Sequence, residues 1–153
     1  MQMRRMATIL AAVALMVTFS SGVALAAFED TITGTDRTDI FTGTNKAEQI
    51  FGLGAPDRIN GGGGDDLVEG DQGSDELGDG LGQDAVYGGI GKDNLIGQGG
   101  DTSRDRFYAG SGDDIVQPFD SPAVEDVVNC GPGTDTVYAD KADKINDNCE
   151  RVR

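Results

Sequence analysis

Acidic residues recur every nine positions along this chain, and their carboxylates are the side chains best suited to do chemistry. Seven aspartates occupy this position in the better copies: Asp57, Asp66, Asp75, Asp84, Asp93, Asp114 and Asp135. Glycines crowd the residues before them, and a backbone without side chains can turn sharply and direct its carbonyl oxygens at one point. Clustered carboxylate and carbonyl oxygens suit the hard, flexible Ca²⁺ ion, whereas Mg²⁺ demands a tighter octahedron and keeps its waters. We therefore expect cation ligands at these turns.

The composition leaves little room for catalysis. The 153 residues include no histidine, which excludes Ser-His and Cys-His nucleophiles, histidine-ligated zinc and histidine acid/base chemistry. A glycosidase-like pair of carboxylates is a further option, but acids repeated at every turn are better explained as ligands or solvated groups. We predict that the chain is not an enzyme.

The charge balance limits the partners. There are 27 acidic residues against 12 basic ones, a formal net charge of -15. A charge of this sign repels nucleic acid and anionic membranes, so we expect neither as a partner. Cations are the natural complement.

The repeat also fixes the hydrophobic positions, because an apolar residue follows each acid by two places. These residues are Phe41, Ile50, Ile59, Val68, Leu77, Val86, Leu95, Phe107, Val116, Val128, Val137 and Ile145. Each unit between 34 and 146 is therefore predicted to form a turn, which is Gly-rich in the better units, and a three-residue strand with one inward side chain. Two units close a coil of about 18 residues, so alternate acids stack in two columns. Successive turns within a column lie roughly 5 Å apart. The burial of so few apolar side chains cannot offset the conformational entropy lost when over a hundred residues become ordered. We therefore expect metal binding and folding to be one event.

The best units read Gly-Gly-Gly-Gly-Asp-Asp at 61–66, Gly-Gly-Ile-Gly-Lys-Asp at 88–93 and Ala-Gly-Ser-Gly-Asp-Asp at 109–114. This pattern resembles the RTX family, the haemolysin-type calcium-binding repeats, whose nonapeptide is Gly-Gly-x-Gly-x-Asp-x-apolar-x. The resemblance implies an all-β fold, a right-handed parallel β-roll (β-solenoid) of about six coils with two nonapeptide units per coil. Calcium would lie between turns that stack one coil apart.

The resemblance also implies ligand sets. One turn of a stacked pair supplies its second and fourth carbonyls and its aspartate, and the other supplies its first and third carbonyls and its aspartate. One ion would then lie among Gly62, Gly64, Asp66, Asp79, Leu81 and Asp84. Another would lie among Asp71, Gly73, Asp75, Gly88, Ile90 and Asp93.

Some units depart from the pattern. Arg37 and Lys46 stand where glycine belongs in the first two units, and a basic residue there opposes a cation. The units 97–108 and 118–129 have 12 residues each, and the second has no glycine. We expect three to six calcium ions, with the stretch from Asp57 to Asp93 the surest. The sequence leaves open whether the turns in 34–51 and 118–129 bind metal.

The two ends indicate export. Residues 1–26 are typical of a secretory signal peptide, with Arg4 and Arg5 before an apolar run and a small-x-small site at Ala24 to Ala26. The run is shorter than the roughly 20 apolar residues of a membrane span, so we expect no stable membrane insertion after cleavage. A lead-in at 27–33, the roll at 34–146 and a C-terminal tail at 147–153 would follow.

The chain has two cysteines, Cys130 and Cys149. In an exported protein an even number favours a disulfide, here tying the tail back to the roll, and two free thiols are the alternative. The segment around them resembles the closing segment of small secreted actinobacterial proteins of the RTX type.

These features predict a secreted calcium-ion-binding repeat protein that folds on binding Ca²⁺ between stacked Gly/Asp turns. The alternative is an accessory or adhesive module of an extracellular enzyme or toxin system. The sequence identifies no protein or surface partner.

Overall fold

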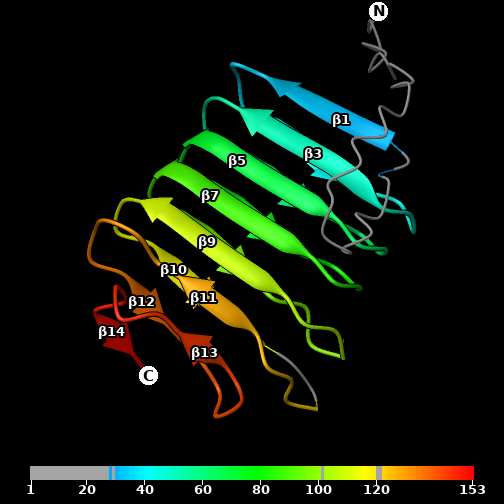
Figure 1. Cartoon of the computed structure of the whole chain (residues 1–153). Helices are drawn as coiled ribbons and strands as arrows, with labels where there is room; N and C mark the ends of the chain where they lie inside the picture. Colours follow the sequence, from blue (N-terminus) through cyan, green and yellow to red (C-terminus); the bar gives the residue numbers. More distant parts are fainter. Residues whose placement is uncertain (1–27, 29, 101, 120–121) are drawn as a thin grey trace, which may run out of the picture.

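The protein is a parallel β-roll built from two facing sheets (Figure 1). A computed structural model describes residue 28 and residues 30–100, 102–119 and 122–153, so the expected signal peptide lies outside the described residues. These residues form 14 strands and no helix, as the all-β prediction requires. The first sheet has the order β1(Asp30–Thr35), β3(Glu48–Leu53), β5(Leu67–Gly73), β7(Ala85–Gly91), β9(Arg106–Ser111), β11(Val127–Asn129) and β13(Lys144–Ile145). The second has the order β2(Ile40–Thr42), β4(Arg58–Asn60), β6(Glu76–Gly78), β8(Asn94–Ile96), β10(Ile115–Gln117), β12(Thr136–Val137) and β14(Arg151–Val152).

The register of the sheets follows the sequence repeat. Consecutive strands alternate between the sheets, and each strand pairs in parallel with the strand one coil later. Val68 lies beside Val86, two units later, and Val86 lies beside Phe107, three residues further because of the longer unit between them. The predicted β-roll is confirmed.

The core is a single row of apolar side chains between the sheets. Ten of the twelve residues predicted to point inward are buried, and the other two, Phe41 and Ile145, are partly buried against them near the ends of the roll. Ala109 and Cys130 complete the buried core. The acid-to-apolar spacing therefore predicted the core correctly.

The two sheets differ in strand length. Strands β6 and β8 have the expected three residues, but β5 and β7 have seven. They are longer because the backbone after Val68 and Val86 stays paired between coils through the start of the next turn, up to Gly73 and Gly91. One column of turns is therefore held partly by sheet pairing.

Turns in the other column need glycine for their shape. Gly62 and Gly64 have φ angles of +101° and +103°, a left-handed conformation that side chains disfavour. A glycine at these two positions lets the chain reverse direction within six residues. The reversal brings the next strand onto the opposite sheet.

The roll is one coil longer than expected, with seven strands in each sheet of the described residues. Strand β1 begins inside the expected lead-in, and Ile32 pairs with Ile50. Strand β14 comes from the expected tail, and Val152 pairs with Val137. Both segments extend the sheets because each repeats the acidic residue followed two places later by an apolar one.

The disulfide predicted between Cys130 and Cys149 is present and spans 19 residues of sequence. Cys130 is fully buried beside the core, so the bridge anchors the last coil to the coil before it.

Among the described residues, we find no helix with the length and apolar character needed to cross a membrane.

Candidate metal centre

From Asp57 onward, the acidic residues of the repeat are tied to the preceding coil through one carboxylate oxygen. Oδ1 of Asp66 accepts the N–H of Glu48 at 2.8 Å, and Oδ1 of Asp84 accepts the N–H of Asp66 at 2.7 Å. The same bond links Asp39 to Asp57, Asp57 to Asp75, Asp75 to Asp93, Asp84 to Asp105, Asp93 to Asp114, Asp105 to Asp126 and Asp114 to Asp135, at 2.7 to 2.9 Å. The carboxylates thus form the two expected columns.

The second carboxylate oxygen has a different environment. Oδ2 is buried without a hydrogen-bond partner in Asp57, Asp66, Asp75, Asp84, Asp93, Asp114 and Asp135. These seven residues are the aspartates that the sequence predicted as metal ligands, and none is more than 2% exposed. A buried anionic oxygen without a partner carries a large desolvation penalty, which a cation would remove.

The units at the two ends satisfy this oxygen internally. Oδ2 of Asp39 accepts the N–H of Thr35 at 2.7 Å and its hydroxyl at 2.9 Å. Oε2 of Glu48 accepts the N–H of Thr44 at 2.9 Å, and Oδ2 of Asp143 accepts the N–H of Asp140 at 2.8 Å. The fold therefore supplies protein donors at the ends and leaves oxygens unpartnered in the middle.

Beside four of the seven unpartnered oxygens, those of Asp57, Asp66, Asp75 and Asp93, a glycine keeps space for a ligand. A Cβ atom on Gly70 would lie 2.5 Å from Oδ2 of Asp75 and 2.7 Å from the carbonyl oxygen of Gly88 in the next coil. At Gly52 the corresponding distances are 2.5 Å to Oδ2 of Asp57 and 2.8 Å to the carbonyl oxygen of Gly70. At Gly52 and Gly70, a carboxylate and a carbonyl oxygen from stacked turns thus converge on a space that a side chain would fill.

The first predicted ligand set lies between two stacked turns. The carbonyl of Gly62 accepts the N–H of Leu81 at 2.9 Å, and the carbonyl of Leu81 accepts the N–H of Gly64 at 2.7 Å. The carbonyl oxygen of Asp79 lies over Gly61, where Oδ2 of Asp66 would also meet a Cβ atom at 2.7 Å. The fold therefore brings these residues together, and the carbonyls of Gly62 and Leu81 accept hydrogen bonds between the two turns.

The second predicted set stacks in the same way. Asp71 pairs with Gly89 and Gly73 with Gly91, and Ile90 pairs with the intervening Gln72. Asp75 donates its N–H to Oδ1 of Asp93 at 2.9 Å. Asp71 takes the left-handed conformation, with a φ of 69°, at the position where the neighbouring turns have Gly62, Gly80 and Gly89.

Burial, and to a smaller extent the neighbouring acids, raises the pKa values of the aspartates in the columns. Burial raises the pKa of Asp84 to about 8, a hydrogen bond from the Asp66 backbone opposes this, and nearby acids, Asp105 foremost, add to it. Burial likewise raises the pKa of Asp66 and Asp93 to about 7. These groups resist ionisation within the bare roll, so a bound cation would be needed to keep them all charged at neutral pH.

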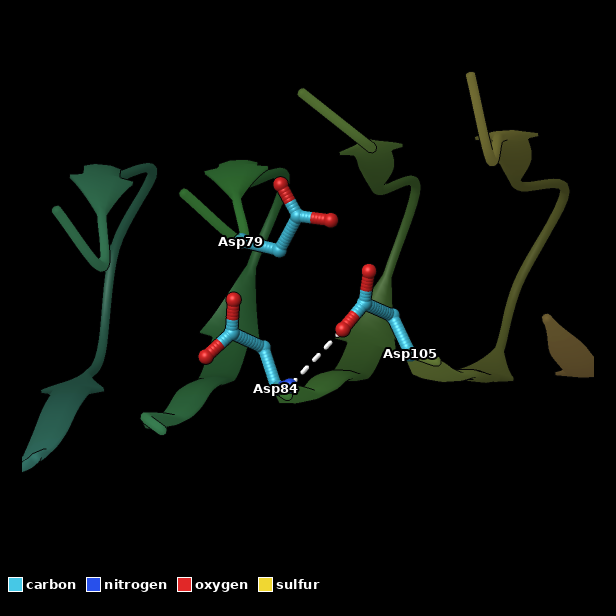
Figure 2. A group of neighbouring side chains, drawn as sticks. All are labelled: Asp79, Asp84 and Asp105. Atoms are coloured by element: carbon cyan, nitrogen blue, oxygen red, sulfur yellow. Dashed lines mark hydrogen bonds between the residues drawn. The ribbon is translucent and has the colours of Figure 1, made fainter. Parts of the chain in front are cut away.

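The structure also brings together carboxylates that the sequence did not predict to meet. We expected Asp79 to contribute a carbonyl, but its side chain is buried as well, and its carboxylate lies above that of Asp84 with one oxygen on the side of Asp105 (Figure 2). One carboxylate oxygen from each of these three residues lies within 4.8 Å of the others. The signal was an aspartate at position 79, where the repeat pattern has glycine, one coil before the longer unit 97–108.

The tail also continues one column. Glu150 accepts the N–H of Asp135 at 2.9 Å, as the next acid would in a regular coil. Its position was missed because the acid two residues before Val152 breaks the nine-residue spacing.

Comparison with protein families agrees with this geometry. The RTX calcium-binding nonapeptide repeat matches the chain in four copies, over residues 42–77, 79–103 and 87–117. The matched ranges include the turns that carry Asp57, Asp66, Asp75, Asp84, Asp93 and Asp114. A search of curated proteins found no significant match.

Proposed function

Starting from the fact that this chain belongs to the RTX calcium-binding nonapeptide repeat family, we propose that it is a secreted calcium-binding protein whose roll folds when Ca²⁺ binds between stacked turns. The role we assign to the ions is structural. They would join successive coils where the protein itself provides no hydrogen-bond donor for the second carboxylate oxygen, Oδ2.

The observation that carries this proposal is the contrast within each column. The end units satisfy the second carboxylate oxygen with a nearby N–H or hydroxyl group, as Thr35 does for Asp39. Seven units between the ends leave that oxygen buried without a partner, and beside Asp57, Asp66, Asp75 and Asp93 a glycine keeps the space open. A chain that only needed stacked turns would have used the same donors throughout.

The same contrast supports a number of ions within the expected range of three to six. At the regular turns, we count a bridging ion only where both members of a stacked pair have an unpartnered oxygen. Five stacked pairs meet this condition: Asp57 with Asp75, Asp75 with Asp93, Asp93 with Asp114, Asp114 with Asp135, and Asp66 with Asp84. We assign the carbonyls predicted from sequence to two of these, the pair Asp66 and Asp84 and the pair Asp75 and Asp93.

Export supports a coupling of folding to calcium. Proteins with these repeats are typically extracellular, and the disulfide between Cys130 and Cys149 agrees with an oxidising compartment. We propose that residues 1–26 direct export, and that low calcium inside the cell keeps the chain unfolded until it meets the higher concentration outside.

Equilibrium dialysis of the chain against calcium, with magnesium as competitor, tests the proposal. We expect three to six calcium ions per chain and little displacement by equal magnesium, because oxygen sites of this size and flexibility favour Ca²⁺. Binding of no more than one ion, or equal competition by magnesium, would contradict it.

A further inference from the structure

The junction between the turn at 79–84 and the next turn in its column differs from the regular ones. Turn 61–66 is joined to turn 79–84 by backbone bonds, such as that from Leu81 to Gly62. The following unit, 97–108, has three extra residues, so its carbonyls no longer match those of turn 79–84 one for one. Here the N–H of Gln98 donates instead to a side chain, Oδ1 of Asp79, at 2.8 Å.

Three buried carboxylates meet at this junction. Asp79, Asp84 and Asp105 are 1%, 1% and 2% exposed, and one oxygen from each lies within 4.8 Å of the other two. Oδ1 of Asp84 is used by the N–H of Asp66, and Oδ1 of Asp105 by the N–H of Asp84. Figure 2 shows the carboxylates of Asp84 and Asp105 rising side by side toward that of Asp79.

The oxygen left on Asp84 points to a ligand. Its Oδ2 is buried without a hydrogen-bond partner, and one oxygen of Asp84 is directed toward Asp79 in Figure 2. Because Oδ1 is held by Asp66 in the preceding coil, Oδ2 is the oxygen available to the cluster. The three carboxylates carry three formal negative charges, and one of them has this unpartnered oxygen. A hard cation would stabilise such a cluster.

We propose that Asp79, Asp84 and Asp105 hold a further calcium ion, in which the carboxylate of Asp79 replaces turn carbonyls lost through the insertion. This inference rests on the proposed calcium-dependent function of the roll. The regular pairs offer two carboxylates to each ion, whereas this junction offers three. Because ligand charge is one of the factors that set calcium affinity, this ion is held more tightly than those at the regular turns.

A purely structural role for Asp79 is the competing explanation. Its Oδ1 accepts the N–H of Gly80 at 2.6 Å as well as that of Gln98 at 2.8 Å, so it ties the longer turn to the shorter one. Asparagine keeps an acceptor oxygen for these two bonds and removes the charge. Asp79→Asn therefore separates the two roles.

Calorimetric titration of the full chain with calcium alone, after removal of bound metal, is the test. We expect Asp79→Asn to lose one ion from the stoichiometry, or to weaken the tightest binding step by about tenfold or more, since charge count tunes calcium affinity over decades. The matched control is Asp65→Asn, in the preceding turn of this column, where Asp65 is exposed and its Oδ1 accepts the N–H of Gln83 at 3.0 Å. It should bind calcium as the wild type does.

The outcomes separate this inference from the proposed function. A wild-type chain that binds no calcium would contradict both. A wild-type chain that binds several ions, with Asp79→Asn equal to it in stoichiometry and affinity, would overturn only the three-carboxylate site.

A measurement on the wild type keeps the test decisive if Asp79→Asn does not fold. Anomalous diffraction from calcium-grown crystals should show a peak among the three carboxylates. Peaks at the regular turns with none between Asp79, Asp84 and Asp105 would refute the site.

Discussion

Replacing Asp93 by asparagine should change the stability of the roll in opposite directions with and without calcium. Oδ1 of Asp93 accepts the N–H of Asp75 at 2.9 Å, and asparagine can keep that bond. Its Oδ2 is buried without a partner, so the substitution mainly removes a buried charge. Asp93 belongs to two of the proposed sites, one with Asp75 and one with Asp114.

Without calcium the lost charge is a benefit. Burial raises the pKa of Asp93 from 3.8 to about 7. A folded pKa above the unfolded one favours the fold at low pH and penalises it as pH rises, here by about 4 kcal/mol at pH 7, at about 1.4 kcal/mol per pKa unit. The buried amide group without a partner costs about 1–3 kcal/mol in return. Asp93→Asn should therefore stabilise the metal-free roll by about 1–3 kcal/mol.

With calcium the substitution is a loss. An ion present at 100 times its Kd contributes about 2.7 kcal/mol, so losing two ions removes about 5 kcal/mol. Subtracting the gain in the metal-free roll leaves Asp93→Asn less stable than the wild type by about 2–4 kcal/mol.

Urea unfolding followed by circular dichroism at pH 7 measures both effects. The chelator series needs a constant level of trimethylamine N-oxide, an osmolyte that favours the compact state, so that the metal-free chain folds enough to be measured. The control is Asp113→Asn, an exposed carboxylate whose Oδ1 accepts the N–H of Thr134 at 3.0 Å, and it should change stability by no more than about 0.5 kcal/mol in either condition. Equal destabilisation of Asp93→Asn in chelator and in calcium would refute the reasoning and assign the carboxylate a structural role.

Three further predictions concern pH, the core and the turns. In chelator, β-structure measured by circular dichroism should decrease from pH 5 to pH 8. Burial raises the pKa values of the aspartates in the columns, from about 6 for Asp75 to about 8 for Asp84, so the folded state loses stability as pH rises through this range. An increase in β-structure over the same range would contradict this prediction. Leu77→Ala should cost about 2–5 kcal/mol in calcium-bound urea unfolding, and Leu81→Ala, at a 46% exposed position, under about 1 kcal/mol; equal costs would argue against the inward row. Gly70→Ala should raise the calcium midpoint of folding because its Cβ would lie 2.5 Å from Oδ2 of Asp75; an unchanged midpoint would place the ion elsewhere.

The sequence predicted the regular part of the roll because one nine-residue period governs turns, core and carboxylates together. Val68, Leu77 and Val86 point inward as their spacing requires. The seven aspartates chosen as ligands are the ones whose Oδ2 atoms lack a partner. Position in the repeat determines both burial and stacking, so a phased pattern carries this information.

What the sequence did not predict lies where the period is broken. Strand β14 follows a shortened spacing, and the proximity of Asp79 to Asp105 depends on how the longer unit 97–108 folds. Which carboxylate oxygen accepts a backbone N–H and which stays unpartnered also depends on hydrogen bonds between coils, which no local sequence pattern specifies. In contrast, Asp30 and Ile32 keep the period one unit upstream, so the first strand was within reach of the same reasoning.

The most direct test of the account is far-UV circular dichroism of the chain in chelator, followed by titration with calcium and, separately, with magnesium. The account predicts a disordered chain in chelator and a cooperative transition to β-structure at roughly 10⁻⁴ to 10⁻³ M calcium, the range of extracellular modules. Magnesium should not produce it. A β-rich spectrum that chelator leaves unchanged would contradict the account, because the roll would then fold without the ions assigned to its unpartnered carboxylates.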